Sequence, residues 1–242
     1  QNQLGLSKTC GALDINLGCS GYVYGLGLAK GLIETGQARR VLFLTGDTHS
    51  KMMHPRDRSV RALFGDAGTA TIIADEGGHG VLSGPFAYGT DGKGGVNLIV
   101  PAGGMRQPRD PNAPSYVDEH GNERTSNNVY MNGAEIFAFT VREVPNVVNR
   151  LLDSAKLTID DVDFFVLHQA SAHVLSHFQR KLRIPPERFA IDMADCGNTG
   201  SSTIPIALSR AVKRGAVRPG MRVMLVGFGV GYSWGATLVH WQ

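Results

Sequence analysis

Apolar runs of strand length alternate with helical stretches along most of the chain. Residues 20–35 combine glycine and alanine with larger apolar side chains, which predicts a closely packed helix that ends near Gly36. The stretch "RRVLFLTGD" follows it, and "FFVL" at residues 164–167 is a second continuous apolar run. Runs of this kind predict strands buried on both faces. The alternation therefore predicts an α/β protein.

The remaining pattern predicts three more helices, four more strands and one long loop. Pro145 interrupts one helical stretch and should kink or restart that helix, and Thr158 has the position of a cap before the 164–167 strand. Residues 101–128 are rich in proline, glycine, asparagine and charge without periodicity, so we expect a long functional or mobile loop. The other expected helices are residues 132–155, "SAHVLSHFQRKL" and the stretch after "CGNTGSS"; the other expected strands are residues 64–76, residues 80–89, "RVMLVGFG" and "YSWGATLVHW".

One helix–strand unit is repeated. Cys19 precedes Gly36 by 17 residues, and Asn198 precedes Gly215 by the same 17 residues, with an apolar strand after each glycine. A duplicated unit predicts two similar halves, residues 1–130 and residues 131–242. The second half contains a complete unit, whereas the first lacks its opening strands.

Composition narrows the classes of function. A hydrophobic fraction of 42% with 19% charged residues is typical of a globular domain, and no apolar run is long enough to span a bilayer. A net charge of +3 is too slight to favour nucleic acid but leaves room for a basic patch facing an acidic partner. Three cysteines, sparse and odd in number, favour a reducing compartment, so we expect a cytoplasmic protein.

Three residues are candidates for chemistry. Cys19 lies where a helix begins, and the helix dipole there should lower the pKa of its thiol. His168 ends the "FFVL" strand, the edge at which α/β sheets bind ligands, and Asn198 starts the duplicated helix. Each alone also fits a structural role, as a buried thiol, a core histidine or a turn residue. Together they suit a cysteine nucleophile with two N–H donors for an enolate, and "GFGVG" (227–231) offers backbone amides for an oxyanion hole.

The motifs "GCSG", "HQA", "GNTGSSTIP" and "GFGVGYSWGATLV", with "DRSVRALFGDAGTATII" between them, resemble those of β-ketoacyl-acyl-carrier-protein synthase III, a condensing enzyme of the thiolase superfamily. The resemblance implies a layered αβαβα fold with an incomplete first half, a homodimer, and coenzyme A thioesters as substrates with no cofactor and no metal. It also implies that an acyl group is loaded onto Cys19 and condensed with malonyl-acyl-carrier protein, with His168 and Asn198 promoting decarboxylation. The backbone amides of Cys19 and Val230 would form the oxyanion hole.

The resemblance further suggests binding residues. Arg58, Ala170 and Gly229 match substrate contacts, and Arg180 and Lys181 match a patch that docks the acidic carrier protein, although a solvated helix face explains that pair equally well. The family has about 90 residues before the point where this chain starts, by domain size. We therefore expect a fragment, a processed product or a chain that needs a partner polypeptide.

Other interpretations stay open. The same fold and the same Cys19 and His168 could serve an acyltransferase acting on an alcohol or amine, and a shortened chain could be a non-catalytic partner of a complete synthase.

Two motifs imitate other kinds of site. His173 and His177 are spaced i, i+4 as in a zinc site, but no third metal ligand is obvious, so we interpret them as a surface pair. "GYVYGLGLAKG" imitates a dinucleotide-binding run but lies within a helix, so packing explains its glycines better.

Overall fold

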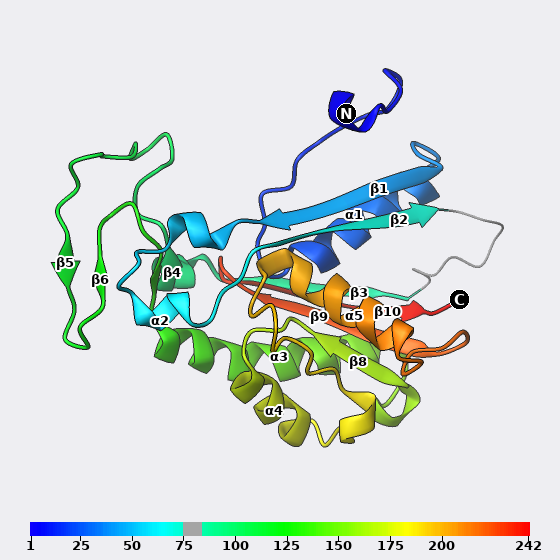
Figure 1. The fold of residues 1–242 in the computed structure, drawn as a ribbon. Coiled ribbons are helices and arrows are strands. Elements are labelled where there is room, and N and C mark those ends of the chain that lie inside the picture. Colours follow the sequence, from blue (N-terminus) through cyan, green and yellow to red (C-terminus); the bar gives the residue numbers. More distant parts are fainter. Residues whose placement is uncertain (75–83) are drawn as a thin grey trace.

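The structure is a computed structural model, and it describes residues 1–74 and 84–242. Its secondary structure alternates as the pattern predicted (Figure 1). The helices are α1 (Gly21–Glu34), α2 (Arg58–Arg61), α3 (Gly133–Ala155), α4 (Ala172–Lys181) and α5 (Thr203–Lys213). The strands are β1 (Arg40–Asp47), β2 (Ala67–Ala74), β3 (Phe86–Thr90), β4 (Leu98–Ile99), β5 (Tyr116–Val117), β6 (Glu123–Arg124), β7 (Tyr130–Met131), β8 (Phe164–Leu167), β9 (Arg222–Gly229) and β10 (Ser233–His240).

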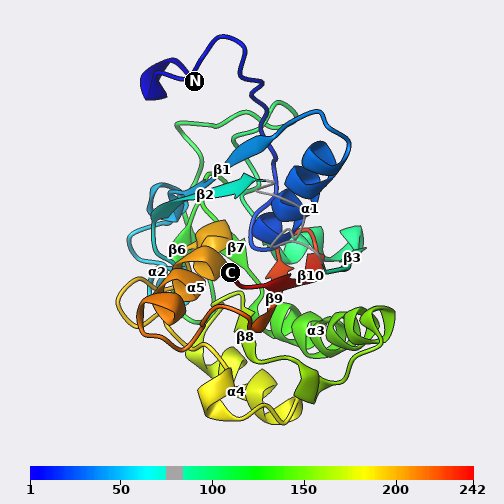
Figure 2. The ribbon, with the colours of Figure 1, turned by 90° about the vertical axis from the view of Figure 1, so that its right-hand side faces the viewer.

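The main sheet has the strand order β3-β10-β9-β8, in which β8 and β9 are parallel and the other pairs antiparallel. Helices α1 and α5 lie between this sheet and the antiparallel β1–β2 pair, while α3 and α4 cover its other face (Figures 1 and 2). These four layers reproduce the αβαβα order without one outer helical layer. The strand expected at residues 80–89 is realised as β3; residues 80–83 lie outside the described residues.

The core follows from the two-residue period of β8, because successive side chains of a strand point to opposite faces. Phe164 and Val166 pack with the apolar residues of α1 and α5. Phe165 and Leu167 pack with those of α3 and α4. All four side chains are buried, so the prediction of a doubly covered strand at 164–167 is confirmed.

The same prediction is wrong for β1. Its side chains alternate between covered and exposed, with Leu42 41% and Leu44 51% exposed, whereas Phe43 packs against the α1–α5 cluster. Among the described residues, α1 covers one face of the β1–β2 pair, and the opposite face carries exposed leucines. A continuous apolar run therefore did not distinguish a central strand from a half-covered one.

Two further expectations are corrected. Helix α3 runs unbroken through Pro145, and the Val141 carbonyl, which has no Pro145 N–H to accept, instead accepts a hydrogen bond from Lys181 Nζ at 2.8 Å. The stretch 101–128 contains the β5–β6 hairpin, which sequence periodicity missed because its strands have two residues each. Buried Arg124 anchors this hairpin through ion pairs with Asp57 and Asp118, each at 2.8 Å.

Candidate active site

Cys19 lies two residues before α1, as predicted, and is only 6% exposed. The end of β9 packs directly on it. A Cβ built on Gly229 would lie 2.7 Å from Cys19 Sγ, and one on Gly227 would lie 2.8 Å from Ser20 Cα. Glycine at these two positions lets the sheet approach the start of α1 closely.

The expectation that the helix start lowers the pKa of this thiol is wrong. Burial raises the pKa of Cys19 to about 11; the amides of Val230 and Cys19 oppose the rise, and the Asp47 carboxylate adds to it. Desolvation of the thiolate outweighs the dipole because the side chain is almost fully enclosed. The favourable N–H groups are nevertheless the two amides expected to form an oxyanion hole.

Two serines tie the nucleophile to the loop that carries Val230. Ser20 Oγ lies 2.6 Å from Ser233 Oγ, and Ser233 Oγ donates to the Val230 carbonyl at 2.8 Å. The Ser20 hydroxyl therefore serves this link rather than capping α1, whose N-cap makes no side-chain hydrogen bond to the helix. The link fixes the Val230 peptide relative to Cys19.

His168 follows β8 directly, and its backbone N–H donates to the Val226 carbonyl at 2.8 Å. The ring is buried and its Nδ1 lies 2.7 Å from Thr203 Oγ1. Burial lowers the pKa of His168 to about 3, with a further lowering from His49, while the Gly200 carbonyl acts in the opposite direction. The imidazole is therefore neutral at any working pH.

Asn198 lies in a glycine-flanked turn, two residues before the short 3₁₀ helix Gly200–Ser202 that precedes α5, rather than at the first turn of α5. Its Oδ1 accepts the Gly200 N–H at 3.0 Å, and its backbone pairs with Leu63 and Gly65. The Gly200 carbonyl accepts from Thr203 Oγ1 at 3.0 Å. One short turn thus orients both Asn198 and, through Thr203, the His168 ring.

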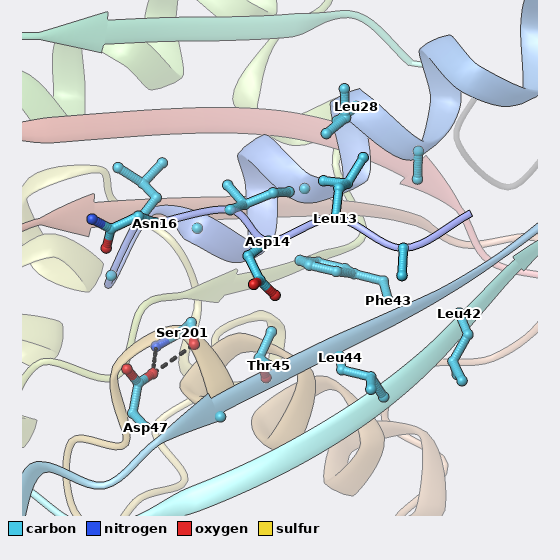
Figure 3. A pocket seen from close by; sticks show the side chains of 18 of the residues that line it. Leu13, Asp14, Asn16, Leu28, Leu42, Phe43, Leu44, Thr45, Asp47 and Ser201 are labelled. Carbon is cyan, nitrogen blue, oxygen red and sulfur yellow. Dashed lines mark hydrogen bonds between the residues drawn. The ribbon is translucent and has the colours of Figure 1, made fainter. Parts of the chain in front are cut away.

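Cys19 and Val230 line a cavity of about 1180 Å³, which extends between the N-terminal segment and β1. Asp47 and Ser201 line it too, and Figure 3 shows the carboxylate bound to the Ser201 turn. His168 and Asn198 do not line this cavity. Hydrogen bonds through Thr203 and Gly200 link them to each other, and their grouping with Cys19 as one catalytic site stays a prediction.

The predicted binding residues are more scattered. Arg58 is exposed on α2, where its backbone N–H donates to Asn122 Oδ1 at 3.1 Å. Ala170 is half-buried, directly after His168, and packs against the core. Neither lines the cavity that contains Cys19.

The predicted docking pair divides in two. Arg180 is exposed in the last turn of α4, whereas Lys181 is engaged with the Val141 carbonyl of α3. On the same helix, the rings of His173 and His177 both pack on Phe137. No group of three or more metal-ligating side chains occurs among the described residues.

Sequence reasoning missed Asp47, Ser201 and Thr203. A signal existed for each: Asp47 ends a strand much as His168 does, and Ser201 and Thr203 are two of the four hydroxyl residues that follow Asn198 within "GNTGSSTIP". The alternation of the chain could not show that Asp47 reaches Ser201 across the two halves.

A buried cysteine facing backbone amides, a neutral histidine directly after β8 and an asparagine in the turn before α5 are the groups that a thiolase-like acyl-transfer site requires. Over its whole length the chain superposes with a TM-score of 0.97 on 72% of a crystal structure of 3-oxoacyl-(acyl-carrier-protein) synthase III that is 52% identical, which establishes this fold.

The comparisons also give the family. The family model described as 3-oxoacyl-[acyl-carrier-protein] synthase III matches residues 13–92, and that of its C-terminal part matches residues 152–241. A β-ketoacyl-[acyl-carrier-protein] synthase III from Fusobacterium nucleatum is 34% identical over all of this chain and 70% of its own length. A relative from Streptomyces coelicolor is 37% identical over 95% of this chain and 67% of its own length. The chain belongs to the 3-oxoacyl-acyl-carrier-protein synthase III family of condensing acyltransferases.

The described residues contain no helix long and apolar enough to cross a membrane.

Proposed function

We propose that this protein transfers an acyl group from an acyl-coenzyme A to Cys19 and condenses it with malonyl-acyl-carrier protein, releasing carbon dioxide and a 3-oxoacyl product. The observation that carries the proposal is the thiol of Cys19 held against the amides of Cys19 and Val230, with Gly229 leaving space above the sulfur. Family membership supports the two substrates, because the relatives' names include the acyl-carrier protein.

In the first step Cys19 Sγ attacks the thioester carbonyl of the acyl-coenzyme A. The negative charge that develops on the carbonyl oxygen is stabilised by the two backbone N–H groups. The new C–S bond forms, the bond to coenzyme A breaks, and the departing sulfur takes the proton that Cys19 loses. A thiol with a pKa near 11 is largely protonated before substrate binds, so Cys19 must lose this proton as the new C–S bond forms.

In the second step the malonyl carboxylate leaves as carbon dioxide, and the electron pair of the broken C–C bond forms an enolate of the thioester. His168 Nε2–H and Asn198 Nδ2 would donate hydrogen bonds to the enolate oxygen. For Nε2 to have the proton, Nδ1 must accept the single proton of Thr203 Oγ1, which lies 2.7 Å away, in place of the Gly200 carbonyl that lies 3.0 Å from the same hydroxyl. A ring with a pKa near 3 donates without becoming charged.

In the third step the enolate carbon attacks the acyl-Cys19 carbonyl. The same two amides stabilise the second tetrahedral intermediate, and its collapse expels the Cys19 thiolate, which regains a proton from solvent. Atoms and charge balance: coenzyme A leaves as its thiol in the first step, carbon dioxide leaves in the second, and the third consumes one proton from solvent.

The test separates the two half-reactions. The protein is incubated with an acyl-coenzyme A, and peptide mass spectrometry locates the acyl adduct; separately, carbon dioxide release from malonyl-acyl-carrier protein is measured. We expect the adduct on Cys19, its loss in Cys19→Ser, and its retention in matched Cys10→Ala and Cys196→Ala variants.

An adduct without carbon dioxide release would replace the proposal with transfer to an alcohol or amine. A folded protein with neither activity would be a non-catalytic partner. The homodimer and chemistry without cofactor or metal remain predictions of the resemblance, and native mass spectrometry tests the first of them. The cytoplasmic location remains a prediction from the cysteine content.

A further inference from the structure

The carboxylate of Asp47 joins the two halves of the molecule beside the nucleophile. It ends β1, and its Oδ2 accepts hydrogen bonds from Ser201 N at 2.8 Å and Ser201 Oγ at 2.6 Å. Figure 3 shows both bonds at the wall of the cavity that Cys19 also lines. None of the chemical steps above uses this carboxylate.

The turn that Asp47 binds is the turn that orients the proposed enolate donors. Gly200 adopts a φ of 60°, and a Cβ added there would lie 2.5 Å from Asp47 Oδ2, so the carboxylate packs directly on the turn. The Gly200 N–H is bound by Asn198 Oδ1, and the Gly200 carbonyl accepts from Thr203 Oγ1. A shift of this turn would move Asn198 directly and His168 through Thr203.

We propose that Asp47 is a positioning residue for the decarboxylating half of the reaction, which holds the turn from Asn198 to Thr203 while keeping a negative charge at the wall beside Cys19. The inference rests on the proposed function for its first part. Its second part concerns the thiol alone and is measurable without any substrate.

The negative charge of Asp47 disfavours the thiolate form of Cys19. After burial, this carboxylate is the largest influence that raises the pKa of Cys19. The titratable groups around it are Cys19 from the start of α1, His49 from the following turn with Nε2 4.0 Å from Asp47 Oδ1, and His168 beyond Gly200. Two hydrogen bonds from Ser201 thus converge on a charge that disfavours the thiolate, which is consistent with positioning rather than activation of Cys19.

Three variants separate the carboxylate's hydrogen bonds from its charge. Asp47→Asn keeps an oxygen that can accept from Ser201 and removes the charge. Ser201→Ala keeps the charge and removes the 2.6 Å bond. Asp47→Ala removes both. Asp66→Asn is the matched control, because Asp66 likewise accepts from the N–H and hydroxyl of one serine, Ser50, but is exposed and does not line the cavity.

Three readouts are taken on each variant: the rate of Cys19 acylation by an acyl-coenzyme A, carbon dioxide release from malonyl-acyl-carrier protein, and the pH profile of iodoacetamide alkylation followed at the Cys19 peptide. We expect Asp47→Ala to lower carbon dioxide release about 100-fold and Ser201→Ala about tenfold, because small displacements of positioned groups are costly. Asp47→Asn and Asp47→Ala should move the alkylation midpoint down by roughly one pH unit. Ser201→Ala and Asp66→Asn should leave it in place.

Wild-type carbon dioxide release in Asp47→Ala would overturn the positioning role, and so would an equal loss of acylation and decarboxylation in Ser201→Ala. An unmoved alkylation midpoint in Asp47→Asn would overturn the electrostatic part. If the unaltered protein releases no carbon dioxide, the proposed function fails, and the alkylation profile still decides whether Asp47 acts on Cys19.

Discussion

The two duplicated units end in the same way and begin differently. Helix α1 is followed by Gly36 with a φ of 73°, and α5 by Gly215 with a φ of 72°, so each helix stops at a left-handed glycine. The serine before each helix makes no cap but reaches into the other half: Ser20 bonds Ser233 at 2.6 Å, and Ser202 bonds Thr45 at 2.8 Å.

The difference lies in where the backbone N–H groups point. In the first unit the Cys19 amide faces its own thiol. In the second unit an extra turn uses its amides internally, Gly200 N–H on Asn198 and Ser201 N–H on Asp47. In the proposed reaction, the first helix start would therefore offer a backbone donor to the substrate, whereas the amides before the second are bound to Asn198 and Asp47.

We expect the largest effect from a substitution that removes the space beside the sulfur of Cys19. Gly229→Ala would place a Cβ 2.7 Å from Cys19 Sγ, so acyl transfer to Cys19 should fall roughly 100- to 1,000-fold as the oxyanion geometry is lost. Gly104→Ala is the control, since nothing lies within 4 Å of its added carbon. The acyl adduct is timed by mass spectrometry. Full acylation in Gly229→Ala would show that the close approach of β9 is irrelevant to the first unit's chemistry.

The second effect is the pH dependence of the thiol. Burial raises the pKa of Cys19 to about 11, and the thiolate fraction below that value rises tenfold with each pH unit. The rate of Cys19 acylation should therefore increase about 100-fold from pH 7 to pH 9. Decarboxylation should not follow, because the pKa of His168 lies near 3 and its ring is neutral throughout. A plateau of acylation near pH 8 would contradict the buried thiol.

The third effect concerns the aiming of His168 in the second unit. Thr203→Val removes the hydroxyl 2.7 Å from His168 Nδ1, and we expect carbon dioxide release to fall about tenfold while acylation is retained. Thr199→Val is a matched control: Thr199 Oγ1 is buried without a hydrogen-bond partner, so this change should be neutral or stabilising. Equal losses from both variants would assign Thr203 a packing role only.

Much of this site could be predicted because each signal is local. Cys19, His168 and Asn198 occupy ends of elements, and the equal spacing to Gly36 and Gly215 marked the repeat before any contact was known. The predictions that failed concern properties that depend on contacts between residues distant in sequence. The pKa of Cys19 reflects its enclosure by Gly229 and Val230, more than 200 residues further on.

The predictions about the fold divide in the same way, into those that rest on local pattern and those that depend on distant contacts. The α/β class and the bounds of the 164–167 strand followed from periodicity, because β8 is covered on both faces. The exposure of one face of β1 could not be predicted, because a continuous apolar run looks the same in the sequence whether one face of the strand is covered or both are. Periodicity also could not show that Lys181, distant in sequence, donates to the Val141 carbonyl that Pro145 leaves without its helical partner.

The smallest effect tests why α1 is rich in glycine while α5 contains none. Gly25→Ala would bring a Cβ to 2.1 Å from the Phe43 ring, and we expect a loss of about 1–3 kcal/mol in the free energy of unfolding. Gly31→Ala lies in the same helix with nothing within 4 Å, and it should gain about 0.5–1 kcal/mol from helix propensity. Denaturant titration measures both. Opposite signs would show that glycine in α1 serves close packing against β1 at specific positions; a loss in both would mean that the whole helix needs glycine, and the contrast with α5 would then reflect the helix itself rather than its neighbours.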